Sequence, residues 1–133
     1  LLRNPFAFVK NKQNIKLNFD VFHGHGNLDK AIDLLEETDR EDFRNFTRSK
    51  SSFNRENLFI CRSKKLIDGY FSSIFPWLEE CEKLFGFELK GYGKTRMYAF
   101  LAERYLSFWF NKYSKPLPWP IFFFDTNKNK LSS

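Results

Sequence analysis

The order of apolar and polar positions along the chain predicts a mostly helical protein. In residues 28–38 and 66–84, apolar side chains recur every three or four positions, as they do on one face of a helix. Asn27 and Ser63 stand just ahead of these segments and are suitable N-cap residues. Pro76 interrupts the second segment and predicts either a kink or the start of a further helix.

Residues 95–110, TRMYAFLAERYLSFWF, form a long apolar run that contains no Pro or Gly. We expect a helix here, beginning at Thr95 as its cap and ending near Tyr113. A shorter helix is expected over residues 40–49, where Phe43 and Phe46 are the apolar positions.

Several short segments have the composition of strands. Residues 6–9 (FAFV), 57–61 (NLFIC) and 121–124 (IFFF) are compact apolar runs, and residues 17–26 (LNFDVFHGHG) begin with alternating apolar and polar positions. These strands are too few and too far apart to close a sheet of their own. The pattern therefore predicts one partial domain over residues 1–133, a piece of a larger α/β unit, with residues 126–133 as a disordered tail.

The apolar run at 95–110 also carries a polar stripe. At 100° per residue, Arg96, Ala99 and Glu103 fall within about 60° of one another, and Ser107 extends the same line. Arg96 and Glu103 are about 10 Å apart along the axis, so they are not a standard ion pair of one helix. One interpretation is a ligand that lies over the small Ala99; the other is that each charge pairs with a residue of another element.

Composition narrows the function classes only in part. The 22 Lys and Arg against 16 Asp and Glu give a net charge of +6, which suggests an anionic partner, but the basic residues are dispersed rather than clustered. We therefore expect no nucleic-acid partner. The 18 Phe, 5 Tyr and 3 Trp are consistent with an aromatic groove or with codon bias alone. Cys61 and Cys81 lack metal-site spacing, and no apolar run is long enough for a membrane span.

Two other positions are chemically suggestive. His23 and His25, in a His-Gly-His sequence, offer two imidazoles to a divalent metal, with Asp20 or Asp29 as a further ligand, or they are ordinary loop histidines. Asn57 stands at the entrance of the NLFIC segment, where it either holds a turn or contacts a ligand.

The segments ENLFICRSKKLIDGYFSSIFPWLEECEK and YGKTRMYAFLAERYLSFWF, within residues 56–110, carry a family resemblance. Together with FDVFHGHGNLDKAIDLL upstream, they resemble a bacterial glycosyltransferase family of capsule and O-antigen loci, formerly classed as a domain of unknown function. The resemblance covers about residues 16–125. Ala99 stands where that family usually has Gly, and Leu58 where it has Met.

The resemblance implies a GT-A-like, Rossmann-like glycosyltransferase domain, of which this chain would be the mostly helical, carboxy-terminal, acceptor-side half with a few short strands. The implied activity is transfer of a sugar, galactose or galactofuranose being candidates, from a nucleotide sugar to a growing surface polysaccharide. The fragment alone is expected to be inactive. The alternative is a non-catalytic basic and aromatic module that binds glycan or anionic lipid.

The expected roles follow from that activity. Glu103 would be the catalytic residue, acting as a base or holding acceptor hydroxyls. The expected substrate-binding residues are Arg96, Asn57, Arg104 and Ala99, and His25 is the candidate metal ligand. The implied cofactors are the nucleotide sugar donor and Mn²⁺ or Mg²⁺, and the implied acceptor is a glycan or lipid-linked glycan. We expect a cytoplasmic location, either free or in peripheral contact with the inner membrane.

Overall fold

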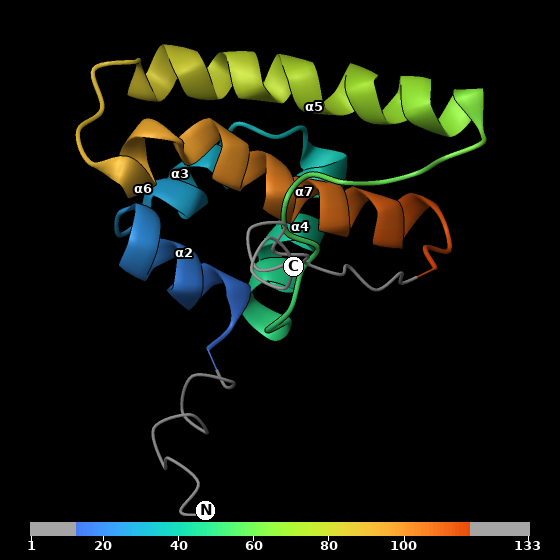
Figure 1. The fold of residues 1–133 in the computed structure, drawn as a ribbon, viewed down its shortest axis with the longest axis horizontal. Coiled ribbons are helices and arrows are strands. Elements are labelled where there is room, and N and C mark those ends of the chain that lie inside the picture. Colours follow the sequence, from blue (N-terminus) through green and yellow to red (C-terminus); the bar gives the residue numbers. More distant parts are fainter. Residues whose placement is uncertain (1–12, 118–133) are drawn as a thin grey trace, which may run out of the picture.

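The computed structural model describes residues 13–117, and within this range the chain forms six helices and no β-strand (Figure 1). The helices are α2 (Ile15–His23), α3 (Asn27–Asp33), α4 (Glu37–Ser49), α5 (Lys64–Phe85), α6 (Tyr92–Thr95) and α7 (Met97–Tyr113).

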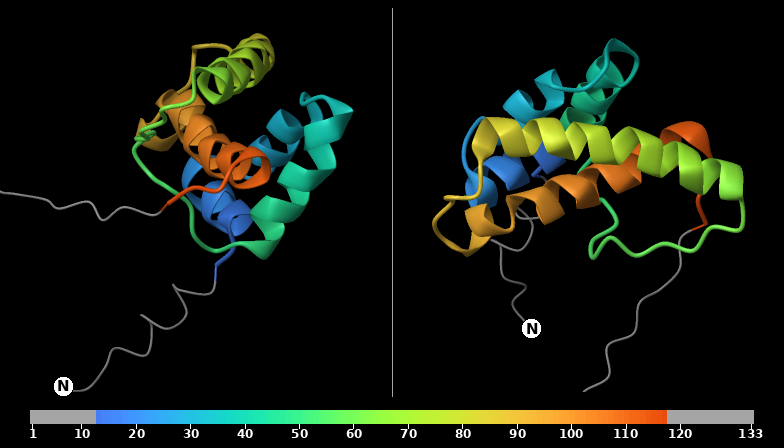
Figure 2. Two further views of the ribbon diagram at one scale, coloured as in Figure 1. Left: turned by 90° about the vertical axis from the view of Figure 1, so that its right-hand side faces the viewer. Right: turned by 90° about the horizontal axis from the view of Figure 1, so that it is seen from above.

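Helix α7 lies at the centre of the fold. It packs against α5 on one side and α4 on another, while α2, α3 and α4 pack against one another (Figure 2). Its buried residues point in almost every direction around the helix axis: Met97, Leu101, Arg104, Tyr105, Leu106, Ser107, Phe108 and Trp109. A helix that is buried on most of its circumference reads as apolar all round, which explains the long apolar run of the sequence.

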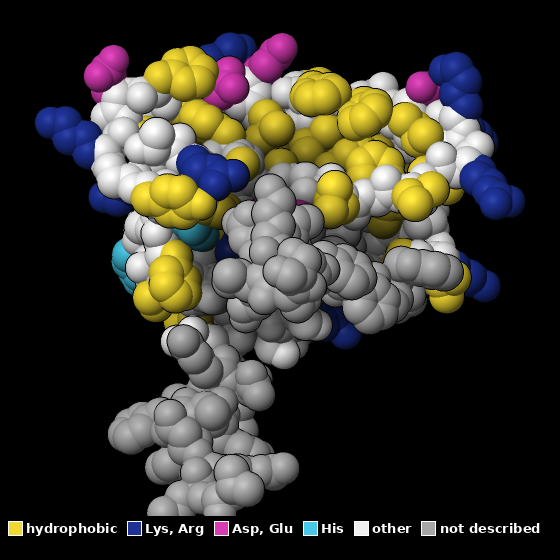
Figure 3. Space-filling view, viewed as in Figure 1, with side chains coloured by type: hydrophobic (Ala, Val, Ile, Leu, Met, Phe, Trp, Pro, Cys, Tyr) yellow, Lys and Arg dark blue, Asp and Glu magenta, His cyan; other side chains and the backbone are white. Residues whose placement is uncertain are grey.

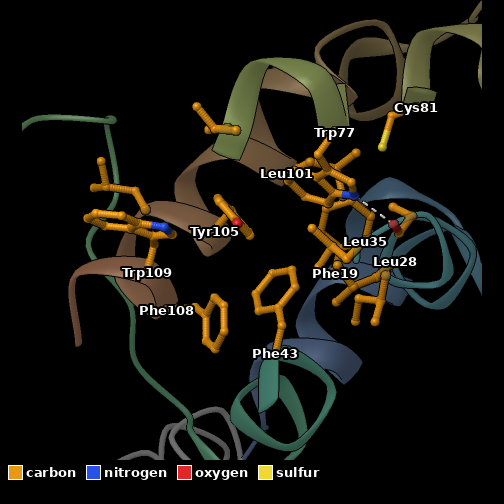
Figure 4. Packing of buried hydrophobic residues seen from close by; sticks show 14 of the residues in the cluster. Phe19, Leu28, Leu35, Phe43, Trp77, Cys81, Leu101, Tyr105, Phe108 and Trp109 are labelled. Carbon is orange, nitrogen blue, oxygen red and sulfur yellow. Dashed lines mark hydrogen bonds between the residues drawn. The ribbon is translucent and has the colours of Figure 1, made fainter. Parts of the chain in front are cut away.

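Within the core, a cluster of aromatic rings is contributed by α4, α5 and α7 (Figure 4). The ring of Phe43 lies 4.9 Å from Phe108, 5.5 Å from Tyr105 and 5.9 Å from Trp77, measured between centroids. The indole Nε1 of Trp77 donates a hydrogen bond to the carbonyl of Ala31 at 2.7 Å, so this buried polar atom is satisfied. These contacts join α4, α5 and α7 and tie α3 to them.

The predicted α/β, Rossmann-like fold is wrong for the residues described, because residues 13–117 contain no sheet. The segment expected to begin with strand-like alternation forms α2 instead. Its buried residues Ile15, Phe19 and His23 are spaced by four, and Asn14 caps the helix by accepting a hydrogen bond from the amide of Leu17 at 2.8 Å. The helical spacing of the larger apolar side chains therefore outweighed a short period-two alternation.

The NLFIC strand is also absent. Residues 57–61 belong to an irregular segment, residues 50–63, that joins α4 to α5 and is named the strap here. No described strand lies beside it, and Ile60 is 99% exposed, so this apolar run is not a buried strand. The predicted strands 6–9 and 121–124 and the tail 126–133 lie outside the described residues.

Two helix bounds differ from the prediction. The first predicted helix ends at Asp33 rather than Thr38, and α4 begins earlier than expected, at Glu37. Asn27 is the first residue of α3, and Gly26, with φ of 77°, occupies the cap position. Ser63 does cap α5, since its hydroxyl accepts a hydrogen bond from the amide of Leu66.

Helix α5 has 22 residues and contains Pro76 without a break. Pro76 lies on the exposed side of the helix, where water can solvate the carbonyl that its missing N–H leaves free. The second alternative, a new helix starting there, is therefore excluded. Among the described helices, none combines the length and the apolar character that crossing a membrane requires.

The aromatic cluster predicts a large effect of truncating its central ring. Phe43 is fully buried, and Phe43→Ala should lower the free energy of unfolding by about 3–5 kcal/mol, because three neighbouring rings lose their contacts with it. Phe87→Ala is the matched control, since Phe87 is 73% exposed and its truncation should change stability by about 0.5 kcal/mol or less. Urea denaturation followed by circular dichroism measures both, and equal effects would contradict the central position of Phe43.

Candidate functional site

A hollow of about 490 Å³ opens between α2, the strap and the amino-terminal half of α7. It is lined by three aromatic rings, by two arginines and two glutamates, and by a histidine and two amides: Phe22, Phe53, Phe100, Arg55, Arg104, Glu56, Glu103, His23, Asn18 and Gln13. A second hollow of about 320 Å³ beside the strap shares Gln13, Asn18, Phe53 and Arg55 with it. We call the larger one the α2–α7 pocket.

Arg104 is the most deeply buried charge in the wall of this pocket, with its side chain 3% exposed. Its guanidinium donates hydrogen bonds to the carbonyl of Phe100 at 3.0 Å, to Glu103 Oε2 at 3.1 Å and to Asn18 Oδ1 at 3.1 Å. The ring of Phe53 lies 4.2 Å from the guanidinium carbon, a cation–π contact. Of the three guanidinium nitrogens of Arg104, Nε alone is buried with no hydrogen-bond partner among the described residues.

Burial lowers the pKa of Arg104 to about 10; the charge of Glu103 opposes this shift, and that of Arg55 adds to it. The guanidinium therefore keeps its charge at neutral pH, while a large part of its hydration is replaced by protein oxygens and an aromatic face.

The polar stripe of α7 does face another element, and that element is the strap. Asn57 Nδ2 donates to the carbonyl of Ala99 at 3.2 Å, and the amide of Glu56 donates to Glu103 Oε1 at 3.3 Å. One turn further on, the amide of Asn54 donates to the hydroxyl of Ser107 at 2.7 Å. Three successive turns of the helix thus hold the strap.

The strap turns sharply where it crosses α7. Glu56 and Asn57 both have positive φ, 72° and 49°, a conformation that side chains other than Gly seldom adopt. Asn57 Oδ1 is buried and has no hydrogen-bond partner among the described residues. Asn57 therefore holds a turn, one of the two roles open to it from the sequence, and it keeps one acceptor unused.

Glu103 lies where the strap, α7 and the pocket meet. One carboxylate oxygen accepts from the strap and the other from Arg104, and the side chain is 14% exposed. A carboxylate held on both oxygens has a fixed orientation, and its remaining lone pairs can accept hydrogen bonds from a ligand in the hollow. Glu103 therefore accepts hydrogen bonds from the strap and from Arg104 of its own helix, and it also lines the pocket. The interpretation of a ligand that lies over Ala99 stays a prediction.

His23 is the site residue that the sequence did not single out from its neighbour His25. It is 6% exposed, stacks on Phe100 at 4.1 Å between ring centroids, and its Nδ1 lies 2.9 Å from the carbonyl of Gly93. Since a carbonyl only accepts, Nδ1 carries the proton and Nε2 is left as an acceptor. A Cβ on Gly93 would lie 2.1 Å from the carbonyl oxygen of Phe22, so this close approach of α6 to α2 requires Gly.

The other predicted residues lie further from the pocket. Arg96 is exposed, donates to the hydroxyl of Tyr92 at 2.5 Å and lies over the rings of Tyr92 and Phe100, at 5.3 and 5.7 Å from their centroids. It is not among the lining residues. Ala99 contributes its carbonyl to the strap rather than a dent for a ligand.

His25 projects into solvent, with its side chain 91% exposed and Nδ1 3.5 Å from Asp20 Oδ2. Two ligands are fewer than a protein site for Mn²⁺ or Mg²⁺ needs. Within residues 13–117, no group of three or more His, Cys, Asp or Glu side chains is placed to hold a metal ion. The residues present therefore do not fit the predicted metal.

Sequence reasoning also passed over Asn18, Phe53 and Arg55. Phe53 and Arg55 lie in a polar segment without periodicity, so no pattern marked them. A signal did exist for His23, which follows Phe19 at helical spacing and so belongs on the buried side of α2.

Comparison with known proteins gives one result. A family model described as "Domain of unknown function (DUF4422)" matches residues 4–115. No curated protein and no solved structure matches the chain.

The buried position of His23 predicts a pH dependence of stability. Burial lowers its pKa below the ordinary 6.5, the hydrogen bond to Gly93 opposes this, and the charge of Arg104 lowers it further. As the pH falls from about 7.5 to about 5.5, the unfolded chain takes up a proton that the folded chain resists, so the free energy of unfolding decreases.

The experiment compares urea midpoints at the two pH values. His23→Gln should lose less stability on acidification than the unmodified chain does, whereas the exposed control His25→Gln should lose as much as the unmodified chain. An unchanged pH response in His23→Gln would show that His23 is not the group responsible.

Proposed function

The chain belongs to the family described as the domain of unknown function DUF4422, and we propose that it forms the acceptor-binding part of a bacterial glycosyltransferase. The proposed reaction moves a sugar, galactose or galactofuranose, from a nucleotide sugar onto a growing surface polysaccharide. The motifs at residues 56–110 that resemble capsule and O-antigen glycosyltransferases support this class, and the α2–α7 pocket supports the acceptor role.

One observation carries the proposal: an oriented carboxylate, Glu103, adjoins a hollow walled by the rings of Phe22, Phe53 and Phe100. The volume of about 490 Å³ falls in the range of about 300–1,000 Å³ that is typical of small-molecule sites. A sugar presents C–H groups that pack on aromatic rings and hydroxyls that need hydrogen-bond partners, and the pocket offers both kinds of surface.

In the proposed transfer, an acceptor hydroxyl binds against Glu103. Its oxygen forms the new bond to the anomeric carbon of the donor, its proton passes to the Glu103 carboxylate, and the nucleoside diphosphate leaves. Arg104 and the amide of Glu56 hold the carboxylate in place for this step, so Arg104 is a positioning residue. Arg96, at the exposed end beyond Phe100, is the candidate contact for an anionic group of the donor or acceptor.

The donor in this proposal is a nucleotide sugar, and a divalent ion, Mn²⁺ or Mg²⁺, would compensate the charge of its diphosphate. Among the described residues, His25 and Asp20 do not make a site for this ion between them.

Glu103→Gln in the complete protein tests the reaction. It keeps the shape of the side chain but removes the base, and sugar transfer from nucleotide-activated galactose or galactofuranose should fall about 10²–10⁴-fold. Glu88→Gln, an exposed glutamate outside the pocket, is the matched control and should retain full transfer. Circular dichroism establishes that both variants fold.

Binding of a galactose-terminated oligosaccharide, measured by calorimetry, separates the two roles of Glu103. Retained binding with lost transfer supports the role of a base, and loss of both supports the role of holding hydroxyls. If Glu103→Gln transfers sugar as well as Glu88→Gln does, the proposal fails. Binding of the oligosaccharide without transfer from any nucleotide sugar would identify a non-catalytic glycan-binding module instead.

A further inference from the structure

Helix α5 carries aromatic side chains on a side that no described element covers. Phe71 and Phe75 are 38% and 55% exposed, and their rings stack with centroids 5.3 Å apart. The middle of the buried side of α5, which packs toward α7 and α3, lies about 90–130° around the helix from Phe71 and Phe75. The buried residues are Tyr70, Ile74, Trp77 and Cys81. Phe59 of the strap, 37% exposed, adjoins Phe71 at 6.4 Å. Figure 3 shows hydrophobic side chains gathered over this part of the molecule.

The charges at the two ends of α5 are mostly of opposite sign, although Asp68 lies in the basic half and Lys83 in the acidic half. Arg62, Lys64 and Lys65 stand at the start of the helix, and Glu79, Glu80 and Glu82 stand in its second half. Lys64 and Glu82 are 18 residues apart, which is five helical turns, so they project from the same side of the helix. Phe71 and Phe75 lie within about 20° of the line along the helix that joins Lys64 to Glu82.

This arrangement is symmetric about position 73. Lys64 and Glu82 lie nine positions before and after it, and Phe71 and Phe75 lie two positions before and after it. A second α5 running antiparallel across this face, on a two-fold axis at position 73, would meet it with complementary charges. Lys64 would face Glu82 of the partner subunit, and Phe71 would face Phe75 of the partner subunit.

We propose that this face, made by Phe59, Lys64, Phe71, Phe75 and Glu82, is the interface of a two-fold symmetric dimer. The intrahelical ion pair of Lys64 with Asp68, at 2.5 Å, does not compete strongly, because both side chains are exposed and such pairs contribute little. Among the ion pairs of the described residues, none involves Glu82, so it is available to the partner's Lys64.

An anionic lipid surface fits the same face less well, since the carboxylate of Glu82 would be repelled. The helix spans about 33 Å, from 22 residues at 1.5 Å each, and a contact between one pair of such helices is smaller than the interfaces of obligate dimers. We therefore expect dimerisation that depends on concentration rather than an obligate dimer.

The first experiment measures the molecular mass of the complete protein by sedimentation over about 1–200 μM. The unmodified protein should shift from monomer toward dimer with concentration. Phe75→Glu should remain monomeric, because it places an unpaired carboxylate against the ring of Phe71 of the partner subunit. Phe87→Glu, which makes the same change at an exposed Phe outside α5, should dimerise as the unmodified protein does.

The charges provide a second experiment that does not depend on losing an aromatic residue. Lys64→Glu and Glu82→Lys should each weaken their own dimer, because each puts like charges opposite one another. An equimolar mixture of the two variants should form a heterodimer, and the double variant K64E/E82K should dimerise like the unmodified protein. Lys64→Cys should cross-link with Glu82→Cys and not with itself, with Cys61→Ser in both chains, which establishes the antiparallel orientation.

A monomer at every concentration would overturn the proposal, and so would equal dimerisation of Phe75→Glu and Phe87→Glu. If the monomer instead sediments with vesicles of phosphatidylglycerol and phosphatidylethanolamine, and Phe75→Glu abolishes this, the face binds lipid and the dimer is excluded. None of these results bears on the sugar-transfer proposal, because α5 contributes no residue to the α2–α7 pocket.

Discussion

The burial of α7 on most of its circumference is the constraint on which the rest of the structure depends. A central helix can carry polar side chains only where other elements supply partners for them, because an unpaired buried polar group costs about 1–3 kcal/mol. Arg104, Glu103 and Ser107 are such side chains, and each has a partner from outside the helix. The partners come from α2 and from the strap, and they lie 47 to 86 positions before the α7 residues that they contact.

The candidate site arises from this same requirement. Bringing Asn18 of α2 and the amides of the strap to α7 fixes the positions of those elements around Arg104 and Glu103. The fit is incomplete, since Arg104 Nε and Asn57 Oδ1 have no partner among the described residues and a hollow remains between the three elements. Few buried polar atoms lack a hydrogen-bond partner in native structures, and one of these two belongs to Arg104, which lines the pocket.

The layered arrangement also determines what α5 exposes. Because α5 lies at the outside of the fold, against α7, only one side of the helix is buried there, while Phe71 and Phe75 project elsewhere. Exposed aromatic residues that stand singly are ordinary in proteins, but here they lie on one line between a basic and an acidic end. The pocket and this face are on different elements, so recognition of a ligand and association between chains can be changed independently.

The sequence by itself determined the helices with the strongest periodicity. The helix ending at Tyr113 and the cap at Ser63 followed from spacing and side-chain chemistry, but the apolar pattern of residues 66–84 includes Phe71 and Leu84, which are exposed. Local pattern also identified Glu103 and Asn57 as polar groups beside apolar elements, which the structure places at the strap crossing. It failed for short apolar runs, because NLFIC and the start of α2 fit more than one local structure and only their neighbours decide which forms.

What only the tertiary structure decided is which distant residues meet. No spacing in the sequence brings Asn18, Phe53 and Arg104 together, since 86 positions separate the first from the last, and their contact depends on how α2 and the strap pack against α7. Nor does spacing distinguish His23 from His25, two residues apart, of which one is buried against Phe100 and the other is in solvent. Periodicity reports on neighbours within one element, whereas a binding site depends on the surfaces of several.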